Sequence, residues 1–216
     1  YFVIISSISR LLQELAGQNY MMENTPYEIK RISLSGSLFI FAYFLHRNFS
    51  FQDYKRIGVA LYLSKKIQLK KIFNLIGDNT NFIHIDIVDK SFSKNNLTND
   101  LRVIKKIKKI WPNQKIEFHI MSKFPMKWVK KIINHADKIY VHFETKENIN
   151  EVRNYIIQRN KDFGIALTLD TNPKKIINIL KRSSGLLILG VKNPGFSGQS
   201  FNNKAFDYID YFNRLY

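Results

Sequence analysis

Two histidines and an aspartate alternate with apolar residues in two separate stretches of the chain. The first stretch is His84-Ile85-Asp86, and the second is Glu117-Phe118-His119-Ile120-Met121. In a strand, residues two apart point to the same face, so His84 and Asp86 would lie side by side. Because the chain has no cysteine, any metal site would have to use imidazole and carboxylate ligands. A hydrogen-bonded core histidine is the alternative that this spacing leaves open.

A polar segment with two glycines is the third chemical signal. Asn193-Pro194-Gly195-Phe196-Ser197-Gly198 follows an apolar run at 185–191 that predicts a buried strand. Backbone N–H groups near Gly195, Ser197 and Gly198 could approach a ligand closely and hold a phosphate. A simple Pro-Gly turn is the alternative that this segment alone does not exclude.

Strands and helices alternate from residue 57 onward, and the chemical motifs fall at strand ends. This alternation indicates a parallel sheet with right-handed crossovers. His, Asp and Gly at the carboxyl ends of strands favour a (β/α)8 TIM barrel, and a doubly wound open sheet is the alternative. We count six strand–helix units in the printed sequence, whereas a closed barrel has eight. The sequence therefore predicts an incomplete barrel. The predicted strands are 57–63, 82–87, 115–120, 138–142, 163–167 and 186–191, and the predicted helices are 65–75, 98–110, 125–134, 146–159, 173–181 and one that begins near Asn203.

The composition describes a basic chain with enough apolar residues for a substantial core. It has 216 residues, 45% of them hydrophobic, and a net charge of +17. This length allows one full domain, or one domain plus a piece of another. In 101–110, Ile104, Ile107 and Ile110 share one helix face with lysines opposite, which is the pattern of a solvated helix. We therefore expect no nucleic-acid partner, and a basic surface that attracts a phosphorylated substrate.

The first 56 residues differ in character from the rest, because they are nearly neutral. Segment 32–45 is uncharged, but as a helix it would span only about 21 Å of a bilayer core of about 30 Å. Snorkelling basic residues could stretch 28–47 to a short membrane span, so a membrane helix and a soluble helical extension are both open. We divide the chain into an N-terminal helical segment, 1–56, and a barrel domain, 57–216. The lack of cysteine fits a cytoplasmic barrel domain.

The motifs, taken in order, resemble the ribulose-phosphate 3-epimerase family over about 56–216. Residues 81–89 resemble the second strand of that family, 118–121 its third-strand histidine motif and 136–144 its fourth strand. The glycine segment resembles the loop that closes over the substrate. The implied fold is a TIM barrel of the ribulose-phosphate-binding type, here without its last two strand–helix units.

The resemblance implies an isomerase of pentose phosphate and carbohydrate metabolism. It would interconvert ribulose 5-phosphate and xylulose 5-phosphate, or a related ketose phosphate, at C3 through a metal-stabilised enediolate. One divalent ion, zinc, iron or manganese, would be held by His84, Asp86, His119 and an aspartate from a seventh strand. Asp86 would also be the base on one face of the substrate. The implied supporting residues are Met121, His142 and Glu144, and the implied phosphate and lid residues are Gly195, Ser197 and Gly198.

The printed chain departs from the family pattern at several positions. The seventh-strand aspartate and the eighth-strand glycine motif have no counterpart in it, and Val88 stands where the family has methionine. By the family mechanism, the printed chain should not epimerise a sugar on its own. The alternative is a membrane-anchored, catalytically altered module that binds a phosphosugar in polyprenyl-linked sugar or surface polysaccharide metabolism. It rests on 28–51, within which Phe44-Leu45-His46-Arg47-Asn48-Phe49-Ser50-Phe51 resembles the end of the last membrane helix of the GtrA-like family. A homo-oligomer is left open.

Overall fold

Seven parallel strands form one curled sheet in the residues that the computed structural model describes, which are 2–3, 58–63, 68–93, 100–192 and 199–215. Their order across the sheet is β1-β7-β6-β5-β4-β3-β2. From β2 to β7 each strand lies beside the next strand along the chain, as in a barrel, whereas a doubly wound sheet reverses at a switch point. The strands are β1 (Phe2–Val3), β2 (Gly58–Tyr62), β3 (Phe82–Val88), β4 (Lys115–Met121), β5 (Lys138–His142), β6 (Asp162–Leu167) and β7 (Leu186–Ile188).

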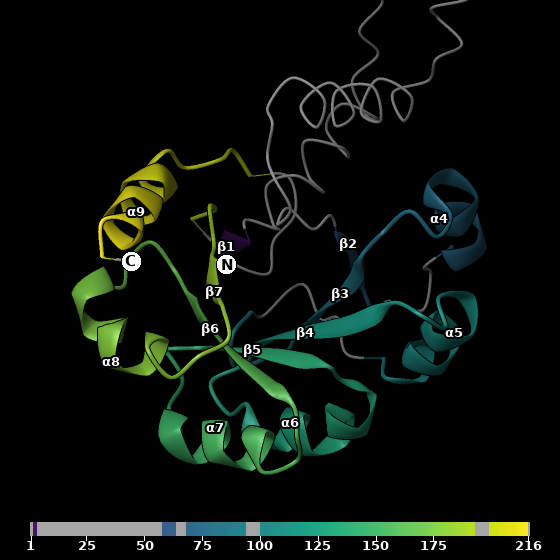
Figure 1. Ribbon diagram of the computed structural model, residues 1–216, viewed down its shortest axis with the longest axis horizontal. Coiled ribbons are helices and arrows are strands. Elements are labelled where there is room, and N and C mark those ends of the chain that lie inside the picture. Colours follow the sequence, from purple (N-terminus) through teal and green to yellow (C-terminus); the bar gives the residue numbers. More distant parts are fainter. Residues whose placement is uncertain (1, 4–57, 64–67, 94–99, 193–198, 216) are drawn as a thin grey trace, which may run out of the picture.

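Helices follow the strands and cover the outer side of the curl (Figure 1). The described part of the chain is therefore a partial TIM-barrel α/β fold. The helices are α4 (Leu69–Ile76), α5 (Arg102–Ile110), α6 (Met126–Ile132), α7 (Ile149–Ile157), α8 (Ile177–Leu180) and α9 (Lys204–Asn213), with the 3-10 turns η1 (Ile133–His135) and η2 (Pro173–Ile176).

Alternating side chains give the sheet an outer and an inner core. Ile83, Ile85 and Ile87 of β3 belong to the large core between strands and helices. His84 and Asp86, which alternate with them, therefore point to the inner face. That face also carries a smaller buried cluster made of Val88, Met121, Tyr140, Ala166, Leu187 and Leu189. Both faces of β3 are covered, so all seven of its residues are buried.

Tyr140 occupies the space that a side chain at position 164 would need. The two residues are partners across β5 and β6, and a Cβ atom on Gly164 would lie 2.3 Å from Tyr140 Cδ1. The glycine therefore lets the fully buried tyrosine ring lie against the backbone of β6. This ring borders the polar side chains of the inner face, since its centroid lies 6.1 Å from that of the His84 ring.

The six predicted strand–helix units are confirmed, with differences at their ends. The strand predicted at 186–191 ends at Ile188, and the helix predicted at 173–181 divides into η2 and α8. The helix predicted from residue 146 begins at Ile149, because the side chain of Asn148 accepts a hydrogen bond from the Asn150 backbone N–H and caps it.

One strand, β1, is not predicted by the sequence. Phe2 and Val3 pair with Leu186 and Leu187 along the outer edge of β7. No helix of the described residues is long and apolar enough to cross a membrane. Residues 4–57, with the uncharged segment and the GtrA-like motif, lie outside the described residues, so their helical and membrane assignments stay predictions.

Candidate active site

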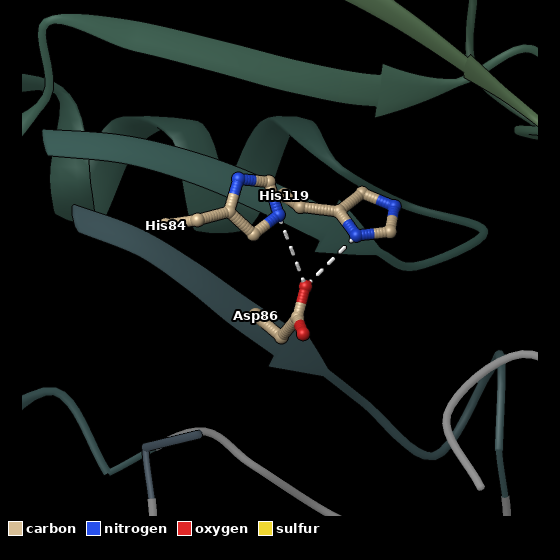
Figure 2. Close-up of side chains that lie close together, drawn as sticks. All are labelled: His84, Asp86 and His119. Carbon is tan, nitrogen blue, oxygen red and sulfur yellow. Dashed lines mark hydrogen bonds and ion pairs between the residues drawn. The ribbon is translucent and has the colours of Figure 1, made fainter. Parts of the chain in front are cut away.

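Side chains from two neighbouring strands converge on the inner face of the sheet. His84 and Asp86 come from β3, and His119 comes from β4, where it is the cross-strand partner of Asp86. Figure 2 shows both imidazoles meeting one oxygen of the Asp86 carboxylate. His119 Nδ1 lies 2.9 Å and His84 Nε2 lies 3.4 Å from Asp86 Oδ1. All three residues are buried, and one donor atom from each lies within 4.8 Å of the others, so the group could hold a metal ion.

The charges of these three groups are coupled. Burial would lower the pKa of His84, but the contact with Asp86 and the negative charges of Asp86 and Glu117 outweigh it and raise that pKa to about 9. Burial would raise the pKa of Asp86, but hydrogen bonds with His119 and His84 hold it well below its ordinary value. Burial lowers the pKa of His119 to about 4, against the opposing effect of Asp86. At neutral pH, a cationic His84 therefore neutralises Asp86, and His119 is uncharged.

A chain of contacts leads from His119 to the loop after β6. His119 Nε2 lies 2.9 Å from His142 Nε2, and His142 Nδ1 lies 2.9 Å from Glu144 Oε2. Glu144 Oε1 accepts hydrogen bonds from the Thr168 backbone N–H at 2.8 Å and from the hydroxyls of Thr168 and Thr171. Burial would raise the pKa of Glu144, but His142 and the threonine donors lower it to about 2. His142 thus touches the site directly, and Glu144 reaches it through His142.

The hydrogen-bond donors among His119, His142 and Glu144 can be assigned, because Glu144 is ionised. A carboxylate only accepts hydrogen bonds, so His142 Nδ1 is the donor to it. If His142 carries only that proton, its Nε2 accepts from His119 Nε2. In that tautomer the neutral His119 has no hydrogen on Nδ1, so a lone pair replaces the hydrogen bond to Asp86 described above. Two acceptors 2.9 Å apart repel each other unless a cation lies against both. This proton arrangement fits a metal ion, because it supplies an imidazole nitrogen and a carboxylate oxygen as ligands.

Glu117 is a further polar residue at this site, and the sequence analysis did not select it. It lies two residues before His119 in β4 and therefore on the same face. Its Oε2 atom lies 3.9 Å from His84 Nδ1, and its Oε1 atom lies 3.7 Å from Lys138 Nζ. The alternation of Glu117 with His119 is the signal that could have found it.

Asp89 joins the loops that follow β3 and β4. Its Oδ1 atom accepts hydrogen bonds from the backbone and hydroxyl of Ser91, at 2.9 and 2.5 Å. Its Oδ2 atom accepts from Ser122 Oγ at 2.7 Å and Trp128 Nε1 at 2.8 Å, and lies 2.7 Å from Lys127 Nζ. Burial would raise the pKa of Asp89, but these donors hold it well below its ordinary value. Asp89 therefore links the ends of the two strands that carry the His–Asp–His group.

The remaining predicted site residues divide into two sets. Met121 is buried at the end of β4 on the inner face, two residues after His119, in the small apolar cluster. Gly195, Ser197 and Gly198 lie outside the described residues, so their contact with phosphate stays a prediction.

Comparison with known proteins assigns the class to which this fold and site belong. The model of the ribulose-phosphate 3-epimerase family matches residues 59–216. The chain is 34% identical over 123 residues to the ribulose-phosphate 3-epimerase of Chlamydia pneumoniae, covering 56% of this chain and 52% of that protein. It is 33% identical over 129 residues to that of Chlamydia muridarum, covering 59% and 55%, and 29% identical over 140 residues to that of Buchnera aphidicola, covering 60% and 58%.

The chain belongs to the ribulose-phosphate 3-epimerase family. It spans about half the length of the curated relatives that it matches. Segment 28–51, with its GtrA-like resemblance, lies outside the matched residues.

Proposed function

We propose that this chain forms part of an isomerase that interconverts ribulose 5-phosphate and xylulose 5-phosphate, or a closely related ketose phosphate, at C3. The observation that carries the proposal is the convergence of His84, Asp86 and His119 on the inner face of a parallel sheet in a member of this family. In a barrel of this kind, chemistry takes place at the carboxyl ends of the strands.

The donor set supports a site for one divalent ion. Two imidazole nitrogens and a carboxylate oxygen suit zinc, iron or manganese, and the set does not choose among them. A bound ion of this kind would stabilise the negative charge that develops on the substrate oxygen when the C3 proton leaves. His84, Asp86 and His119 are the residues that would hold it.

We assign the removal of the C3 proton on one face of the substrate to the Asp86 carboxylate. Asp86 is ionised at neutral pH, and the His84 imidazolium beside it balances its charge. Inversion needs a second acid–base group on the opposite face. Among the described residues, Asp86 supplies the one carboxylate of the His–Asp–His group, and the family resemblance assigns the second acid–base role to an aspartate of a seventh strand.

The glycine segment would bind the phosphate group of the substrate. Backbone N–H groups near Gly195, Ser197 and Gly198 would bind its oxygens, since glycine permits close approach of the backbone. No described residue favours the alternative function of a membrane-anchored module.

Metal analysis of the purified chain tests the proposal. The wild-type chain should retain one equivalent of zinc, iron or manganese, and the double variant His84→Ala, His119→Ala should retain none. His135→Ala, on η1 and away from the group, is the matched control and should behave as wild type. Equal metal content in the wild type and the double variant would overturn the site assignment. Deuterium uptake at C3 of ribulose 5-phosphate, followed by NMR, should parallel the metal content.

A further inference from the structure

Two buried polar atoms on the inner face have no hydrogen-bond partner among the described residues, and they face each other. They are His84 Nδ1 and Glu117 Oε2, which lie 3.9 Å apart. From this pair we infer that Glu117 is a positioning residue that orients the His84 imidazole toward the metal site. The inference rests on the proposed metal-binding role of His84.

The register of the sheet places Glu117 where it can act on His84. His84 and Glu117 are cross-strand partners in β3 and β4, and Glu117 and Lys138 are cross-strand partners in β4 and β5. The three side chains therefore form a row across the inner face. The next row toward the carboxyl ends contains Asp86 and His119. His84 thus belongs to the same row as Glu117 and Lys138, and the other two proposed ligands, Asp86 and His119, lie in the next row.

Lys138 fixes the direction of the Glu117 carboxylate. Its Nζ atom lies 3.7 Å from Oε1, whereas the other oxygen, Oε2, is the one that faces His84. Each carboxylate oxygen therefore has its own nitrogen-bearing neighbour. Glu117 is held between two strands, with 12% of its side chain exposed.

This arrangement determines which imidazole nitrogen faces the site. A hydrogen on Nδ1 can be donated to Glu117, so Nε2 is left for Asp86 or for a metal ion, and Nε2 is the atom that lies 3.4 Å from Asp86 Oδ1. A hydrogen bond needs a separation of about 2.9 Å, so a shift of about 1 Å by the ring or the carboxylate would complete it. Metal-ligating histidines generally donate their second N–H to such an acceptor.

Three variants of the 216-residue chain distinguish an effect of Glu117 on the His84 ring from a general effect on folding. Glu117→Gln keeps an acceptor oxygen and removes the charge, whereas Glu117→Leu removes the acceptor. Glu151→Leu, on the exposed side of α7, is the matched control. The readouts are the affinity for Co²⁺ alone, from titration of its absorption bands, and the ¹H–¹⁵N NMR signal of the His84 ring, identified by its loss in His84→Ala. Circular dichroism checks the fold of each variant.

We expect Glu117→Leu to weaken Co²⁺ binding about 10- to 100-fold and to abolish the slowly exchanging, downfield Nδ1–H signal of His84. Glu117→Gln should keep that signal and lose less affinity, and Glu151→Leu should match the wild type. If Glu117→Leu does not fold, a Glu117→Gln protein with wild-type Co²⁺ affinity overturns the inference.

The failures of the two proposals can be told apart. If His84→Ala abolishes Co²⁺ binding and both Glu117 variants bind as the wild type does, the metal site stands and the positioning role of Glu117 is wrong. If the wild type does not bind Co²⁺, the metal proposal fails, and the loss or persistence of the His84 Nδ1–H signal in metal-free Glu117→Leu still decides whether Glu117 orients the ring.

Discussion

His119 and His142 face each other with their Nε2 atoms 2.9 Å apart and their rings stacked at a centroid distance of 5.0 Å. His142 is in turn held by Glu144, at 2.9 Å from its Nδ1 atom. The orientation of His119 therefore depends on a second histidine, whereas His84 faces a carboxylate, Glu117. Because the two histidines of the site have different outer partners, each partnership can be tested separately.

His142→Ala should weaken metal binding about 10- to 100-fold, because His119 loses the group that orients its ring. Glu144→Gln should have a smaller effect, since an amide oxygen can still accept from His142 Nδ1. Competition with a chromophoric chelator for Zn²⁺ would measure both affinities, with His135→Ala as the control. Wild-type affinity in His142→Ala would mean that packing alone orients His119.

Gly164→Ala should lower the free energy of unfolding by about 1–3 kcal/mol, because the added Cβ would lie 2.3 Å from Cδ1 of the buried Tyr140 ring. Gly185→Ala is a milder comparison, since the atom nearest to its Cβ would be the Tyr140 hydroxyl oxygen, at 3.0 Å. Adding Tyr140→Leu to Gly164→Ala should recover part of the loss in urea unfolding experiments. If the Gly164→Ala substitution is equally costly with and without Tyr140, the ring is not the cause.

The stability of the metal-free protein should fall as the pH rises above neutrality. The pKa of His84 is raised from 6.5 to about 9, so the folded state holds this proton more tightly than the unfolded chain. The resulting stabilisation is complete below pH 6.5 and is lost as the pH rises through 9. We expect a loss of about 1–3 kcal/mol over this window. His84→Gln should remove the slope in urea unfolding with a chelator present, and an unchanged slope would contradict the assignment.

The opposite slope should appear on the acid side. The pKa of His119 is lowered to about 4, so between pH 6.5 and 4 the unfolded chain binds a proton that the folded state does not. Stability should therefore fall as the pH decreases through this range. In urea unfolding experiments on His119→Gln, the free energy of unfolding should depend less steeply on pH in this acid range than in the wild type. The same dependence in both proteins would mean that other groups cause it.

The parts of the site that depend on local spacing could be predicted from the sequence. His84, Asp86 and His119 alternate with apolar residues, so their common face follows from strand geometry. Glu117 also alternates with His119, but its contact with His84 depends on the register between β3 and β4, which is a non-local property.

The strand β1 and the role of Gly164 could not be predicted from the sequence either, because both depend on contacts between distant parts of the chain. The strand β1 has two residues, and its pairing depends on an edge of β7 far along the chain. The need for Gly164 depends on where the Tyr140 ring lies, on a neighbouring strand. Such relationships exist only in the folded chain, whereas the six strand–helix units follow from apolar periodicity along it.

The Asp89 carboxylate connects the ends of β3 and β4, the two strands that carry the proposed ligands. One carboxylate receives hydrogen bonds from the loop after β3 through Ser91 and from the region after β4 through Ser122 and Trp128. Releasing either loop leaves a buried charge with too few donors, so opening one side favours opening the other. The His–Asp–His group should therefore be assembled or lost as one cooperative unit, with no stable state in which one histidine strand has detached while the other stays in place.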